Sequence, residues 1–120
     1  AIDLESTLWE IIDGVNTTKI SLEYDVEGTL PNPIKYAFIA IVKEAVNNIQ
    51  KHSNAKNASI RVCMHPGFYL LSIADNGTKI STTDSRGIGL SNMEERVRAL
   101  NCVIRFDTEN GFKITIIIRR

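Results

Sequence analysis

The sequence predicts a single α+β domain, a two-layer α/β sandwich whose mixed, mostly antiparallel sheet of about five strands is covered on one face by three helices. Helical and strand patterns follow the order αβαββαββ, so that the later strands come in adjacent pairs. Adjacent hairpins and segregated helices favour this architecture. At 120 residues the chain fits one hydrophobic core, and residues 1–120 are therefore expected to form one domain.

The first half of the chain carries two helical patterns separated by a strand. Apolar residues at helical spacing predict a helix over residues 3–15, and strict alternation predicts a strand over residues 20–26. Pro31-Asn32-Pro33 then opens the longest helical pattern, whose apolar stripe runs through residues 34–49. His52-Ser53-Asn54 interrupts this pattern, so the central helix is expected to end there.

The second half predicts two hairpins around a third helix. Residues 75–89 contain few apolar side chains and are expected to form a surface loop. Ser91 and Glu94 have the spacing of a capping box, which would begin a helix that runs to Leu100. Asn110-Gly111 is a strong signal for the last hairpin turn. The four strands expected in this half cover residues 59–64, 68–74, 102–107 and 112–119.

Composition excludes several classes of function. Fourteen basic residues balance fourteen acidic ones, so no net charge attracts the chain to nucleic acid or to an anionic membrane. Cys63 and Cys102 lie inside apolar runs, which suits free thiols in a reducing compartment. No apolar stretch approaches the ~18 residues of a membrane span. Because the chain begins with Ala1, we expect a fragment of a larger protein, whose membrane segments would lie upstream.

The central helix carries three polar residues where its apolar face meets its polar face. On a helical wheel, Glu44, Asn48 and Lys51 cluster beside the apolar stripe, whereas Lys43 and Asn47 point toward water together with Gln50. A carboxylate or amide beside the core is costly unless it finds a partner. The alternative is an ordinary amphipathic helix whose boundary residues are satisfied locally.

Two glycine-containing segments are candidate ligand sites. Asp75-Asn76-Gly77 follows an apolar strand, where the carboxylate can accept a hydrogen bond from a ligand and the glycine leaves room for a flat ring. Gly87-Ile88-Gly89-Leu90 precedes the helix at Ser91, where converging backbone N–H groups favour phosphate. The alternative for the first segment is a common turn, and the alternative for the second is a flexible junction. Neither a Walker loop nor a dinucleotide-binding fingerprint is present.

Taken in order, these features resemble the GHKL ATPase superfamily, whose members share the Bergerat fold. Residues 44–53 look like the N box, residues 75–77 like the first glycine box and residues 87–90 like the second. The Lys-His-Ser ending of the first motif and the Gly-x-Gly-Leu-x-x-Met-x-Glu-Arg run are similar to NarL/DesK-type sensor histidine kinases. The resemblance spans nearly the whole chain.

The resemblance implies a role for each matching position. Asn48 would hold Mg²⁺, Glu44 would orient or activate the attacking group, and Lys51 would reach the phosphates. Asp75 would recognise the amino group of adenine beside Gly77. Residues 78–86 would form a lid over ATP. The remaining ATP-binding residues implied in this way are His52, Arg86, Gly87, Gly89, Leu90 and Ser91.

The implied activity is transfer of the γ-phosphoryl group of Mg-ATP to a histidine on a separate helical domain that also mediates dimerisation, with a response regulator downstream. The fragment would lie on the cytoplasmic side of a bacterial sensor and contact neither nucleic acid nor membrane. An anti-sigma-factor-type serine kinase and a non-catalytic nucleotide-sensing or dimerisation module are the alternatives. Lys79 and Phe112 depart from the family pattern, which has glycine and often threonine there. Neither His52 nor His65 has the surroundings of a phosphorylated histidine.

Overall fold

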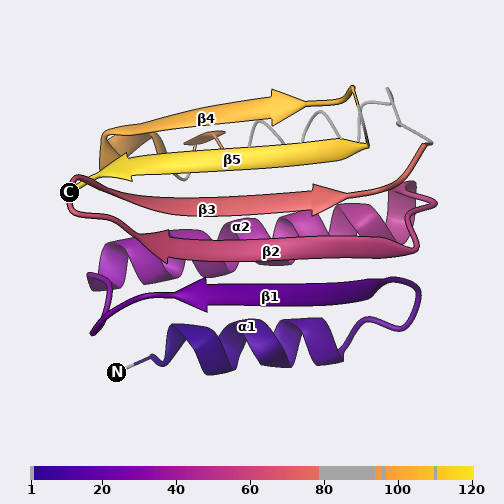
Figure 1. The fold of residues 1–120 in the computed structure, drawn as a ribbon, viewed down its shortest axis with the longest axis horizontal. Helices are drawn as coiled ribbons and strands as arrows, with labels where there is room; N and C mark the ends of the chain where they lie inside the picture. The colour runs from indigo at the N-terminus through magenta and orange to yellow at the C-terminus, as the bar shows by residue number, and fades with distance from the viewer. Residues whose placement is uncertain (1, 79–93, 96, 110) are drawn as a thin grey trace.

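The computed structural model describes residues 2–78, 94, 95, 97–109 and 111–120, and it confirms the α+β class. Five strands form one mixed sheet in the order β1-β2-β3-β5-β4. β1 and β2 are parallel and the other three pairs are antiparallel (Figure 1). The strands are β1 (Lys19–Asp25), β2 (Asn57–Met64), β3 (Phe68–Asp75), β4 (Cys102–Asp107) and β5 (Phe112–Arg119).

Two α-helices accompany the sheet in the described residues, α1 (Leu4–Asp13) and α2 (Asn32–His52). α2 connects the parallel strands β1 and β2 and lies behind the sheet in Figure 1, while α1 runs beside β1. The ammonium group of Lys35, a buried α2 residue, donates a hydrogen bond of 2.9 Å to the carbonyl of Ile2 and so ties the start of the chain to α2. Neither helix has both the length and the apolar character needed to cross a membrane, in the residues described.

The prediction of three helices needs correction for the described part of the chain. Glu94, Glu95 and Val97 are helical, but the segment then tightens into the 3₁₀ helix η1 (Arg98–Leu100). Asn101 adopts a left-handed backbone conformation (φ 53°) directly before β4 begins, which ends the helical segment there. The capping residue expected at Ser91 lies outside the described residues.

The core lies between α2 and one face of the sheet. Alternate residues of β3 and β5 point inward, with Leu71 and Ile116 fully buried and paired across the two strands. The apolar stripe of α2 covers them, and Phe38 and Ile41 have no exposed surface. Burial of this kind contributes about 25 cal/mol for each Å² of apolar surface. The stripe therefore fixes which side of α2 faces the sheet.

One end of this sandwich brings together segments that are distant in sequence. The connector between α2 and β2 meets the end of β3, because the Asn76 side chain accepts hydrogen bonds from the backbone N–H groups of Lys56 and Asn57. The turn between β4 and β5 reaches the same place. A Cβ atom added at Gly111 would collide with the backbone carbonyl of Asp75. The candidate motifs before β2 and after β3 therefore share one end of the sheet.

Gly111 should tolerate substitution far less well than Gly28. Both have positive φ angles, 90° and 77°, but a side chain at Gly28 would meet nothing within 4 Å. We expect Gly28→Ala to cost only the conformational strain, about 1 kcal/mol, and Gly111→Ala to cost about 3 kcal/mol or more, because it adds a backbone collision. Urea unfolding of both variants measures the loss of free energy of unfolding. Equal losses would show that Gly111 does not approach Asp75 as closely as described.

Candidate functional site

The wheel prediction for α2 is confirmed for Asn48 and Glu44, whereas Lys51, which the wheel also places beside the apolar stripe, is exposed. Asn48 is only 3% exposed, whereas Lys43, Asn47 and Gln50 lie in water. Glu44 is half-buried, one helical turn before Asn48, and Lys51 is exposed near the end of the helix. The polar edge of α2 therefore passes from a buried amide to an exposed ammonium group as it approaches the C-terminal end of the helix.

Asn48 is unusual because part of its amide is buried without a partner. Its Nδ2 atom is the one buried side-chain nitrogen or oxygen with no hydrogen-bond partner in the part of the chain that the structure describes. Leaving such a group unpaired costs about 1–3 kcal/mol. A buried amide donor of this kind is a candidate ligand-binding group, since an acceptor oxygen of a bound ligand can satisfy it.

Asp75 ends β3 instead of opening a surface loop, which corrects the boundary expected from the sequence. It is 7% exposed and lies in register between Ala58 of β2 and Phe112 of β5. Its Oδ1 atom accepts a hydrogen bond of 2.9 Å from the backbone N–H of Gly77. A carboxylate in this position is held in one orientation at the end of the sheet.

Phe112 occupies the position where the family pattern often has a threonine. It is buried in the core and stacks against Phe106, with ring centroids 6.2 Å apart. Phe112 has no hydroxyl group to support the neighbouring Asp75, and Thr115 does not replace it because Thr115 pairs with Ser72, further along β3. The Gly77 amide contributes a hydrogen bond that orients the carboxylate.

The structure brings only part of the predicted site together. Asn48 lies one turn before the C-terminal end of α2, and Asp75 and Gly77 follow the strand that meets the α2–β2 connector. Sequence reasoning missed Asn54, whose side chain bonds to Thr78. The signal that could have revealed it was a polar side chain two residues after the end of α2. The predicted residues that lie outside the described part of the chain are Arg86, Gly87, Gly89, Leu90 and Ser91, together with Lys79.

The donor set suits a magnesium ion that is shared with a phosphate ligand. No group of three or more His, Cys, Asp or Glu side chains able to hold a metal is present among the residues described. Mg²⁺ usually takes one or two protein oxygens and completes its shell with phosphate and water. The Oδ1 atom of Asn48 would be a single ligand of this kind, while its unpaired Nδ2 atom, an N–H donor, suits a phosphate oxygen.

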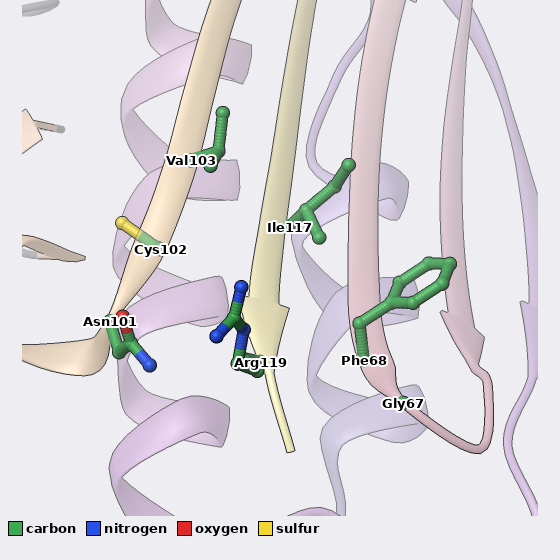
Figure 2. Close-up of a pocket in the computed structure, with 7 residues that line it drawn as sticks. All are labelled: Gly67, Phe68, Asn101, Cys102, Val103, Ile117 and Arg119. Carbon is green, nitrogen blue, oxygen red and sulfur yellow. The ribbon is translucent and has the colours of Figure 1, made fainter.

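A hollow of about 270 Å³ on the other face of the sheet is a different feature. Figure 2 shows Phe68, Val103 and Ile117 around it on β3, β4 and β5. It lies where β3 begins, and Asp75 is where β3 ends. Burial raises the pKa of the Cys102 thiol beside it, and the Sγ–H group donates to the carbonyl of Val97 at 3.1 Å. The hollow therefore offers neither a reactive thiolate nor the predicted motifs.

Solved structures support the fold. The chain superimposes on the histidine kinase domain of a blue-light activated histidine kinase from Erythrobacter litoralis with a TM-score of 0.76 and 19% identity, covering 96% of this chain and 58% of that one. The histidine kinase AdeS of Acinetobacter baumannii gives a TM-score of 0.73 at 19% identity over 98% of this chain and 65% of that one.

Curated relatives are similar in sequence over a shorter span. The sensor histidine kinase DesK of Bacillus subtilis is 37% identical over 79 residues, which cover 64% of this chain and 21% of DesK. The histidine-protein kinase/phosphatase DegS of the same organism is 30% identical over 88 residues, 69% of this chain and 23% of DegS. The chain thus spans about a fifth of these relatives.

The match to a family is broader and includes the positions of all three motifs. Residues 36–120 match the family described as histidine kinase-, DNA gyrase B- and HSP90-like ATPases. That span contains most of α2 and strands β2 to β5, and therefore includes the buried Asn48 and the oriented carboxylate of Asp75. This chain therefore belongs to the histidine kinase-, DNA gyrase B- and HSP90-like ATPase family.

Proposed function

We propose that this domain binds Mg-ATP and donates its γ-phosphoryl group to a histidine on a separate phosphoacceptor and dimerisation domain in two-component signal transduction. The observation that carries the proposal is the placement of an unpaired buried amide, Asn48, and an oriented buried carboxylate, Asp75, on elements that meet at one end of the sheet. The amide can donate its N–H to a phosphate oxygen and offer its carbonyl oxygen to a metal, and the carboxylate suits the amino group of a purine.

The base would be recognised at the end of β3. The Gly77 amide holds one oxygen of Asp75 in place, so the carboxylate can accept a hydrogen bond from the amino group of adenine without reorganising. A side chain at Gly77 would approach the Ser53 hydroxyl to 2.5 Å. The segment is therefore closely packed on one side, and glycine keeps its backbone accessible to the ring of the base.

The phosphates would lie toward α2. Asn48 is the proposed metal ligand, and the bound Mg²⁺ would offset the negative charge of the triphosphate. Glu44 would orient or activate the attacking group, and Lys51 would bring a cation to the phosphates, with His52 following it in sequence. In the second glycine box, Gly87, Gly89, Leu90 and Ser91 would supply backbone donors and Arg86 a further positive charge; these five residues stay predictions.

The phosphoacceptor domain and the response regulator are proposed because the relatives are named as histidine kinases. DesK and DegS are named sensor histidine kinase and histidine-protein kinase/phosphatase, and four fifths of each lies outside the match, which leaves room for a helical phosphoacceptor domain. A response regulator would then take the phosphoryl group, and the fragment would occupy the cytoplasmic side of a membrane-bound sensor. The names favour this proposal over a serine kinase of the anti-sigma-factor type.

Asp75→Asn should weaken ATP binding without disturbing the fold. The substitution keeps the size of the side chain but removes the charge that strengthens a hydrogen bond to the adenine amino group. We expect the Kd for Mg-ATP, measured by calorimetry, to rise by about 10- to 100-fold. Lys113→Gln, a change on the outward side of neighbouring β5, serves as the control and should leave affinity unchanged. Equal affinities for Asp75→Asn and the original chain would remove Asp75 from the site.

Asn48→Leu should make the nucleotide-free domain more stable while impairing its use of magnesium. Leucine branches at the same atom as asparagine, and it removes the buried amide that has no partner. The free energy of unfolding without nucleotide should rise by about 1 kcal/mol. The tightening of ATP binding by Mg²⁺ should disappear. A variant that is destabilised yet retains the magnesium effect would contradict the proposed role.

The chain alone should bind ATP but incorporate almost no phosphate. His65 lies in the turn between β2 and β3, where its ring stacks on that of Phe68 with centroids 4.5 Å apart. This turn is at the opposite end of β3 from Asp75. Incubation with γ-labelled ATP should label a histidine only when a cognate helical domain is added. ATP binding without phosphoryl transfer to that domain would favour the non-catalytic nucleotide-sensing module. Label on the isolated chain would contradict the prediction that this chain contains no acceptor histidine.

A further inference from the structure

The connector that joins α2 to β2 is held firmly on the side of β1. The hydroxyl of Thr18, itself buried, donates a hydrogen bond of 3.0 Å to the carbonyl of Ala55. The backbone N–H of Lys19 bonds to the carbonyl of Lys56 at 2.9 Å. Within the connector, the Ser53 hydroxyl accepts from the N–H of Ala55 at 3.0 Å. The connector thus provides a fixed support at the end of the sheet.

Asn54 uses this support to hold the residue that follows the first glycine box. Its Oδ1 atom accepts from the backbone N–H of Thr78 at 2.9 Å, and its Nδ2 atom donates to the Thr78 hydroxyl at 3.0 Å. One side chain therefore fixes both the backbone and the side chain of Thr78. Such a two-point contact restrains orientation as well as position.

The restraint on Thr78 passes directly to the carboxylate of Asp75. Gly77 lies between them, and its N–H is the group that holds Asp75 Oδ1 at 2.9 Å. A Cβ at Gly77 would also lie only 3.2 Å from Asn54 Oδ1. The Asn54 amide is therefore packed against the peptide whose direction sets that of the carboxylate.

We propose that Asn54 is a positioning residue for purine selection: by fixing Thr78 and hence Gly77, it holds the Asp75 carboxylate in the direction that an exocyclic amino group requires. This inference rests on the proposed function and adds to it the residue that sets base preference. Adenine presents an amino donor to such a carboxylate, whereas guanine presents a carbonyl oxygen that it repels. Loss of the restraint should therefore reduce the preference for ATP over GTP.

The test compares ATP and GTP binding, with Mg²⁺, for three variants of the whole 120-residue chain. Asn54→Ala should weaken ATP about tenfold and change GTP less than about twofold. Thr78→Val removes the hydroxyl but keeps the N–H bond, so a smaller loss of about threefold is expected. Gln50→Ala, which truncates an exposed amide on the outward side of α2, is the control.

A ligand-free measurement separates this inference from the proposed function. In hydrogen exchange without nucleotide, Asn54→Ala should speed exchange of the Gly77 and Thr78 amides while the urea midpoint stays close to that of Gln50→Ala. Faster exchange in a chain that binds neither nucleotide would overturn the proposed function but support the restraint. Unchanged exchange, or equal loss of ATP and GTP affinity, would overturn the role of Asn54.

Discussion

Burial of the α2 stripe against the inner face of the sheet is the constraint on which the rest of the structure depends. Phe38, Ile41 and Ile49 occupy the stripe, and they face Leu71 and Ile116 on the two central strands. Rotating α2 to expose Asn48 would expose these apolar side chains as well. Because the apolar burial outweighs the cost of one unpaired amide, the helix keeps Asn48 at the core and presents Lys43 to water.

The same packing determines where the two candidate motifs meet. β1 and β2 are parallel, so the chain must cross the sheet from the end of β1 to the start of β2, and α2 makes that crossing. The C-terminal end of α2 therefore lies near the start of β2. The antiparallel partner β3 ends at that point, which brings Asp75 beside the connector. The meeting of helix end and strand end thus follows from topology.

Individual polar groups then refine this end of the domain. The side chains of Asn54 and Asn76 reach across in opposite directions, one from the connector to Thr78 and the other from the residue after β3 to Lys56 and Asn57. Gly111 permits the last turn to approach the Asp75 carbonyl. The buried, unpaired amide of Asn48 and the hydrogen bond that orients the Asp75 carboxylate are therefore found at the same end of the domain.

The sequence by itself determined the class, the five strands and the side of α2 that faces the core, because hydrophobic periodicity reports directly on which face is buried. It placed Asn48 inward and Asn47 outward for that reason. Only the tertiary structure decided that Asp75 belongs to β3, that Phe112 fills the core beside it, and that Asn54 holds Thr78. These contacts join residues about 20 to 40 positions apart, and local pattern carries no information on which side chains a strand register brings together.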